Sequence, residues 1–186
     1  MCVLNSGRVR CSGYNGRNQS QLGRPRLSGW STRLDLVAGL SSDVEQIQTG
    51  GVWTCARRRG GTVACWGRNG GYIGNGRGLI IAQSATQIVN ITDAEQLYVG
   101  SSHACVRQRD NRIACWGSNS YAQLGVQWPT SPRSPIFVGA FVGASSISLG
   151  FRGTFVIDDH QAYWIGETYA TGGGRAQAEE LTLMQH

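Results

Sequence analysis

Six cysteines are the residues of this sequence with the clearest capacity for chemistry, and they occur in three pairs. The pairs are Cys2 and Cys11, Cys55 and Cys65, and Cys105 and Cys115. Eight or nine residues separate the members of each pair, and a turn-like segment lies midway between them. Directly opposed residues of an antiparallel hairpin have Cα atoms roughly 4.5–5.5 Å apart, within reach of a disulfide. The spacing therefore favours three disulfides, each inside one hairpin.

Two other states of these cysteines stay open at this point. Zinc sites use short Cys-x-x-Cys clips, which this spacing does not provide, and buried free thiols need no partner at all. Disulfides closing loops of about ten residues would contribute roughly 2.5–3 kcal/mol each in the chain-entropy model. Paired cysteines would also favour an oxidising compartment, such as the periplasm or the cell exterior.

The remaining side chains form no recognisable catalytic or cofactor motif. No two of His103, His160 and His186 have the spacing of metal ligands, and no serine lies in a G-x-S-x-G elbow. The glycine-rich stretches lack the Lys-Ser/Thr of a phosphate-binding loop. Because no nucleophile, base and oxyanion donor occur together, we predict that the protein is not an enzyme and uses no cofactor or metal.

The net charge is +6, and all 17 basic residues are arginines. Residues 1–77 hold 11 of them against Asp35, Asp43 and Glu45, whereas residues 78–186 hold six against eight acidic residues. Such a basic half could face nucleic acid, an acidic protein or anionic lipid, or could consist of solvated loops. The candidate contact residues are Arg24, Arg26, Arg33, Arg57, Arg58 and Arg59.

A repeat of about 50 residues positions these side chains. Each copy holds a hairpin, then a Leu-Gly or Ile-Gly pair, then Val/Ile/Leu-rich segments that close on Gly50, Gly100 or Gly150. Four short strands per copy are the content of one β-propeller blade. No helical period is sustained along the chain. The sequence therefore predicts an all-β fold, a partial β-propeller of about 3.5–4 four-stranded blades.

We expect residues 1–186 to form one repeat domain with four blades. Their ranges are 1–50, which starts within a blade, 51–100, 101–150, and the degenerate, incomplete 151–186. In the fourth copy, Phe155 and Tyr163 replace the cysteines together. The tryptophans at the end of the second hairpin strand, Trp66, Trp116 and Trp164, are predicted to be packing residues.

The pattern G-x-x-H-x-C, followed by G-x-V-x-C-W-G-x-N-x-x-x-Q-L-G, resembles the repeat of the regulator of chromosome condensation family. The resemblance is to its alpha-tubulin-suppressor-like branch, and residues 100–125 match best. Family members are usually closed seven-bladed rings, so the resemblance implies about half a ring here. It also implies that His103 is structural and hydrogen-bonds to backbone. The fourth copy lacks the Asn and the Gln-Leu-Gly of the pattern.

Half a ring leaves two blade faces uncovered, and uncovered sheet attracts partners. We therefore predict a non-catalytic protein-interaction or scaffold module, an accessory subunit whose open faces are covered by a protein partner or a second copy. The alternatives are a small-GTPase regulator, as the best-known family member is, and a nucleic-acid or nucleoprotein binder using the arginine-rich half. No apolar run is long enough to span a membrane.

Overall fold

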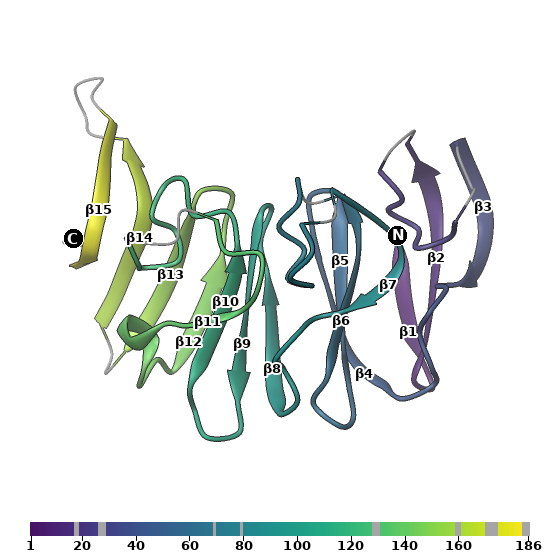
Figure 1. Cartoon of the computed structure of the whole chain (residues 1–186), viewed down its shortest axis with the longest axis horizontal. Helices are drawn as coiled ribbons and strands as arrows, with labels where there is room; N and C mark the ends of the chain where they lie inside the picture. The colour runs from purple at the N-terminus through teal and green to yellow at the C-terminus, as the bar shows by residue number, and fades with distance from the viewer. Residues whose placement is uncertain are drawn as a thin grey trace.

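The computed structural model is built almost entirely of antiparallel β-sheets. It describes residues 1–16, 19–25, 29–68, 70–78, 80–127, 131–158, 161–169 and 175–183. Four sheets, here called blades 1 to 4, stand side by side in chain order, with the two ends of the chain at opposite ends of the row (Figure 1). The fold is thus the partial β-propeller that the sequence predicted.

Blade 1 has three strands, and each of the other blades has four. Blade 1 consists of β1 (Cys2–Asn5), β2 (Arg8–Asn15) and β3 (Gly29–Leu36). Blade 2 consists of β4 (Val44–Gly50), β5 (Trp53–Arg58), β6 (Val63–Arg68) and β7 (Ile81–Gln87). Blade 3 consists of β8 (Ala94–Val99), β9 (His103–Gln108), β10 (Ile113–Gly117) and β11 (Ile136–Phe137). Blade 4 consists of β12 (Ser146–Leu149), β13 (Gly153–Asp158), β14 (Gln161–Tyr169) and β15 (Arg175–Leu183).

The sheets are one strand out of phase with the sequence copies. The strand that closes the first copy, β4, pairs with β5 of the second copy and so opens blade 2. A tight turn joins β4 to β5, whereas a longer connection separates β4 from β3. Neighbouring strands joined by a short turn pair most readily. The blade boundaries in space therefore fall near residues 43, 93 and 145 of the chain.

The glycines spaced 50 residues apart mark places where neighbouring blades touch through their backbones. A Cβ added to Gly50 would lie 1.8 Å from the carbonyl oxygen of Gly100. One added to Gly100 would lie 2.7 Å from the carbonyl oxygen of Gly150. No other residue fits such an approach, which explains why the repeat keeps glycine there.

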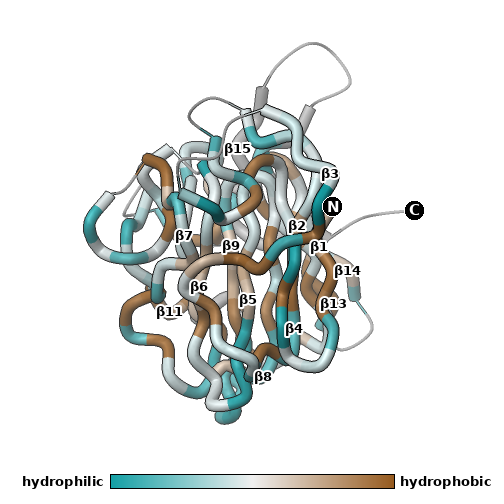
Figure 2. The backbone as a smooth tube through the Cα atoms, turned by 90° about the vertical axis from the view of Figure 1, so that its right-hand side faces the viewer, coloured by the Kyte–Doolittle hydropathy of each residue, from teal (hydrophilic) through white to brown (hydrophobic). Residues whose placement is uncertain are grey.

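Three hydrophobic clusters form the core, one at each contact between adjacent blades. Two of them are centred on fully buried tryptophans, Trp66 between blades 1 and 2 and Trp116 between blades 2 and 3. Figure 2 looks along the row from the blade 1 end and shows hydrophobic segments in brown recurring along the stacked strands. Because every internal blade buries both faces, its strands read as nearly continuous apolar runs.

Apart from the strands, the described residues contain the 3₁₀ turn Gly139–Phe141. No helix among them is long and apolar enough to span a membrane.

Candidate interaction surface

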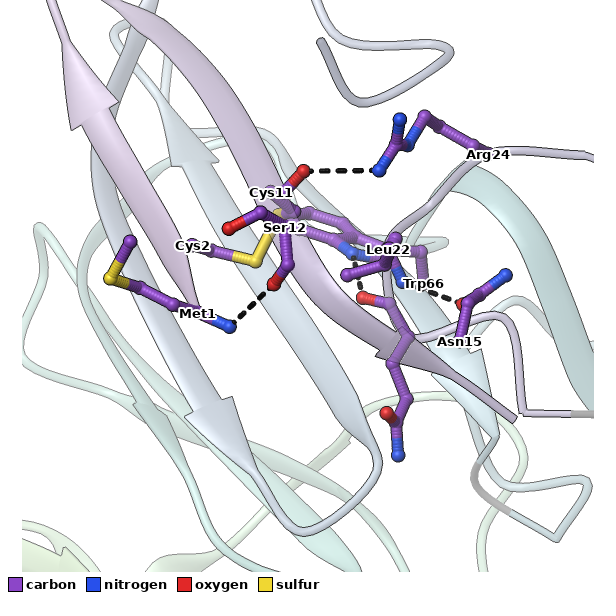
Figure 3. The surroundings of a disulfide bond; sticks show 9 residues. Met1, Cys2, Cys11, Ser12, Asn15, Leu22, Arg24 and Trp66 are labelled. Atoms are coloured by element: carbon purple, nitrogen blue, oxygen red, sulfur yellow. Dashed lines mark hydrogen bonds between the residues drawn. A yellow bond between two sulfur atoms is a disulfide. The ribbon is translucent and has the colours of Figure 1, made fainter. Parts of the chain in front are cut away.

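The six predicted cysteines form three disulfides, all within hairpins. In each case the two cysteines oppose each other directly across the two strands of the hairpin, with Cα atoms 4.1–4.2 Å apart. Figure 3 shows the first bridge, beside which the Met1 amino group donates to the Ser12 carbonyl at 2.8 Å. The cysteines are therefore structural links and supply neither a metal site nor a reactive thiol.

Each disulfide faces the blade that follows it in the chain. Cys55 and Cys65 pack in one cluster with Leu97 and Trp116 of blade 3. The third disulfide packs in the same way with Ile147, Val156 and Ile165 of blade 4. We call the side of a blade that carries these positions its outer face, because it points away from the preceding blade.

The prediction for the fourth copy was wrong by one residue. Phe155 occupies a cysteine position, but it opposes Trp164, and Tyr163 opposes Val156 on the other face. The fourth hairpin is one residue shorter than the second and third, so aligning its tryptophan with Trp116 shifts the register. A one-residue slip moves a side chain to the opposite face of the sheet. Aligning the copies on the glycine that ends the hairpin, instead of on tryptophan, would have avoided the error.

Blade 4 thus has an aromatic pair where the other blades have a disulfide. The ring centroids of Phe155 and Trp164 lie 4.4 Å apart in an edge-to-face arrangement. The indole fills space that a side chain at Gly153 would need, since an added Cβ would lie 2.1 Å from it. Its Nε1 donates to the backbone carbonyl of Glu167 in the same blade at 3.0 Å. Its hydrogen bond is therefore made within the blade and leaves no donor for a neighbour.

The outer face of blade 4 exposes apolar side chains. Phe155 is 40% and Ile157 42% exposed, and Trp164 is half-buried beside them. The equivalent cysteines of blades 2 and 3 are fully buried by the next blade. No described residue covers this face of blade 4. Contiguous exposed apolar residues on a sheet are typical of an interaction surface.

Blade 1 presents an equally unusual face at the other end of the row. Counting from the paired cysteines, Arg10 and Ser12 occupy the positions that Ala64 and Trp66 hold in blade 2. Arg10 is exposed, and Leu36 opposite it is 47% exposed. We call this the receiving face of blade 1, because the same side of each later blade receives the disulfide of the blade before it. The repeat pattern alone did not predict this face.

His103 lies buried where blade 3 meets blade 4. Its Nε2 is 2.9 Å from the hydroxyl of Thr154, which itself donates to the Gln123 carbonyl at 2.7 Å. Because that hydroxyl has one hydrogen, Nε2 carries the proton and donates to it. Burial lowers the pKa of His103 to about 4, so the ring is neutral at pH 7. The expected hydrogen bond to backbone is replaced by one to a side chain of the next blade.

Two of the predicted contact arginines surround Asp35 in blade 1. Arg24 donates to this carboxylate at 2.5 Å and to the carbonyl of Cys11 at 3.2 Å, while its own side chain is 15% exposed. Arg33 lies 3.6 Å from the same carboxylate and is 85% exposed. Arg26 lies outside the described residues. Much of the positive charge of this loop is therefore offset locally.

The arginines of the β5–β6 turn form a second, separate group. Arg57 and Arg59 share the carboxylate of Glu45, at 2.8 and 3.5 Å respectively. Arg58 donates to the carbonyl of Gly39 at 2.9 Å. The Arg57 side chain is 15% exposed and that of Arg59 is 77% exposed. Four of the described arginines thus pair with two different carboxylates, Asp35 and Glu45, and Arg59 is the most exposed arginine of this turn.

Two cavities lie between blades. One of about 460 Å³ lies between blades 1 and 2 and is lined by Tyr14, Gln21 and Trp53, among others. Another of about 360 Å³ lies between blades 2 and 3 beside Arg68 and Tyr72. Among the described residues neither lining holds a carboxylate or an imidazole. The described residues also contain no group of three or more His, Cys, Asp or Glu side chains placed to hold a metal.

Residues 95–123 match the family model of the regulator of chromosome condensation (RCC1) repeat. They include β9, β10 and Gln123, and so cover most of the best-preserved copy of the pattern. No curated protein sequence matches the chain. The match confirms the predicted type of repeat.

Solved structures similar to this chain include two of the yeast protein RCC1 (Prp20). Yeast RCC1 (Prp20), in a crystal structure with Kap60 bound, aligns with a TM-score of 0.75 and 18% identity, covering 96% of this chain and 46% of that chain. Human WBSCR16 aligns with a TM-score of 0.71 and 17% identity, covering 96% of this chain and 50% of that chain. Prp20p of Saccharomyces cerevisiae aligns with a TM-score of 0.76 and 16% identity, covering 98% of this chain and 49% of that chain. Its structure is described together with its binding properties to Gsp1p and histones.

These identities show a shared fold. The chain spans about half the length of the structures that it matches. It therefore has the fold of about half such a propeller, and its residues 95–123 match the RCC1 repeat.

Proposed function

We propose that this protein is a non-catalytic protein-interaction module and that the outer face of blade 4 holds its partner. The observation that carries the proposal is the exposure of Phe155 and Ile157 on a face that is buried in the blades before it. Completing the burial of a large apolar side chain contributes on the order of 1 kcal/mol or more. A partner that covers Phe155, Ile157 and Trp164 together gains this contribution at each of them.

The similar structures support a protein partner without naming one for this chain. Kap60, Gsp1p and histones are the molecules named with the yeast proteins. A small-GTPase regulator remains the alternative that the repeat family suggests, and a nucleotide-exchange assay would test it. A nucleic-acid binder draws less support, because Arg24, Arg57 and Arg59 are each within 4 Å of a carboxylate. We keep the exposed Arg59 turn as a proposed second, basic contact.

The test is a substitution that puts a charge on the outer face of blade 4. Tagged wild-type chain and Ile157→Asp would be purified from the same host, and every stable association measured by native mass spectrometry. We expect the wild type to be found in complexes and Ile157→Asp to lose them, because a buried unpaired carboxylate is costly. The matched control is Ile80→Asp, since Ile80 is 59% exposed away from this face. Complexes that survive Ile157→Asp unchanged would overturn the proposal.

A further inference from the structure

We infer that the partner is a second copy of this chain, docked head to tail, with the outer face of blade 4 in one copy packed on the receiving face of blade 1 in the other. The inference rests on the proposed function and names the occupant of that same face. Two features carry it: the side-chain sizes of the two faces, together with the tryptophan–glycine contact that both lack, and the net charges of the two end segments.

Two of the three internal contacts between blades pair a small outer face with a large receiving face; in the third, Ile165 of blade 4 takes the tryptophan position. The outer face contributes a disulfide, and the receiving face contributes Trp66 or Trp116. Trp66 lies so close to Gly23 of the preceding blade that an added Cβ would be 2.9 Å from its ring, and Trp116 approaches Gly74 in the same way at 2.6 Å. The tryptophan therefore fits only against the glycine of a Leu-Gly or Ile-Gly pair.

At the two ends of the row this arrangement is reversed. The outer face of blade 4 is large, because Phe155 and Trp164 replace the cysteines. The receiving face of blade 1 is small at the tryptophan position, where Ser12 replaces Trp66, while the larger Arg10 replaces Ala64 beside it. Close packing requires that volume gained on one side of an interface be lost on the other. Neither end face matches an internal blade, but each compensates the other.

The glycine contact is missing from both partners as well. The fourth copy has no Gln-Leu-Gly segment to receive a tryptophan. Blade 1 has no tryptophan to insert, since Ser12 takes its position. The two end faces therefore lack complementary parts of the same contact, which agrees with a direct contact between them. The tryptophan is also absent from the covered receiving face of blade 4, where Ile165 takes its position.

The net charges of the two end segments of the sequence are opposite. Residues 1–43 hold six arginines and two acidic residues, a net charge of +4, whereas residues 146–186 hold two arginines and five acidic residues, a net charge of −3. Arg10 replaces the alanine of the internal receiving faces at the centre of this surface. A guanidinium placed against an aromatic pair such as Phe155 and Trp164 is favourable. Opposite net charges also orient the encounter head to tail.

A head-to-tail contact is heterologous, so it either closes into a ring or continues as a filament. The chain covers 46% to 50% of the similar propellers, so two copies would supply about as many blades as one of them. Closure with two copies uses both end faces of each copy and leaves neither exposed. We therefore expect a closed pair.

The test blocks one face at a time and then mixes the variants. Ser12→Trp restores the large residue on the receiving face, and Ile157→Asp charges the outer face of blade 4. Native mass spectrometry and light scattering should show two copies for the wild type and one copy for each variant alone, with unchanged melting temperatures. An equimolar mixture should recover a one-to-one pair, since one unaltered copy of each face remains.

A charge variant adds a graded readout. Arg10→Glu should raise the dissociation constant of the pair at least about tenfold. The matched control Arg109→Glu, an exposed arginine in the blade 3 turn, should not change it. A wild-type chain that stays a single copy, or a mixture that fails to pair, overturns the inference. If a single copy of the chain binds a different protein through Ile157, the proposed function is retained and the inference of a second copy is wrong.

Discussion

Blades 3 and 4 are built from the same hairpin, yet their outer faces have opposite properties. In blade 3 the paired positions are Cys105 and Cys115, fully buried and covered by blade 4. In blade 4 the same positions are Phe155 and Trp164, partly exposed and packed on each other. Both blades therefore keep the hairpin, which is one residue shorter in blade 4, while the residues at these two positions differ.

The donor that crosses from blade to blade differs in parallel. Trp53 donates from its indole to the Gly100 carbonyl of the next blade at 2.9 Å, and His103 donates to Thr154. At the equivalent position blade 4 has Gly153, whose missing side chain makes room for Trp164. Covered faces thus reach across to their neighbour, whereas the uncovered face satisfies its polar groups internally.

The largest expected effect contrasts a covered tryptophan with an uncovered one. Trp116→Ala should lower the free energy of unfolding by about 3–5 kcal/mol, because a fully buried indole leaves a cavity. Trp164→Ala should cost only about 1–2 kcal/mol, since its side chain is half-buried. Urea unfolding of both variants measures the difference. Equal losses would show that the outer face of blade 4 is as much a part of the folding core as the internal interfaces.

The covered interface between blades 3 and 4 can also be tested through the dependence of stability on pH. Burial lowers the pKa of His103 from 6.5 to about 4, so the unfolded chain binds a proton more readily than the native state. The neutral His103 therefore contributes fully to the free energy of unfolding above about pH 6.5. This contribution, up to roughly 3 kcal/mol, is lost as the pH falls toward 4. Stability measured across this range should depend on pH less steeply in His103→Gln. Identical pH profiles for the two proteins would mean that His103 is accessible to protons in the native state.

The register of blade 4 can be tested by transplanting a disulfide. A Phe155→Cys, Trp164→Cys double variant should oxidise, because these positions oppose each other as the native pairs do. Phe155→Cys with Tyr163→Cys should keep both thiols free, since Tyr163 lies on the other face. Thiol labelling and intact mass distinguish the outcomes. We expect the new bridge to change stability by less than about 2 kcal/mol, because the lost aromatic pair offsets the loop entropy.

The smallest effect contrasts two arginines that share one carboxylate. Arg59→Gln should change the free energy of unfolding by less than about 0.5 kcal/mol, because its ion pair with Glu45 is largely in solvent. Arg57→Gln should cost about 1–2 kcal/mol, since the Arg57 side chain is mostly buried and makes a charged hydrogen bond. Thermal unfolding resolves the two. A larger loss of stability for Arg59→Gln than for Arg57→Gln would show that side-chain exposure does not determine how much each ion pair stabilises the fold.

Much of this protein was determined by its sequence alone. The glycines spaced 50 residues apart, the paired cysteines and the recurring hairpin pattern predicted the blades, the disulfides and the type of repeat. These features are local: a hairpin register depends on residues near a turn, and a disulfide partner lies within about ten positions. Local rules therefore sufficed for the strands and for the pairs that oppose each other.

What the tertiary structure decided depends on contacts between blades. The phase of the sheets, with β4 in blade 2, follows from which strand lies next to which, and the sequence copies do not mark it. The face on which Trp164 lies required the register of the shortened hairpin, because one residue reverses the side of a strand. The partner of His103 comes from a blade that only folding brings beside it. Surfaces and contacts between blades are decided by packing between residues far apart in the sequence, which no local pattern encodes.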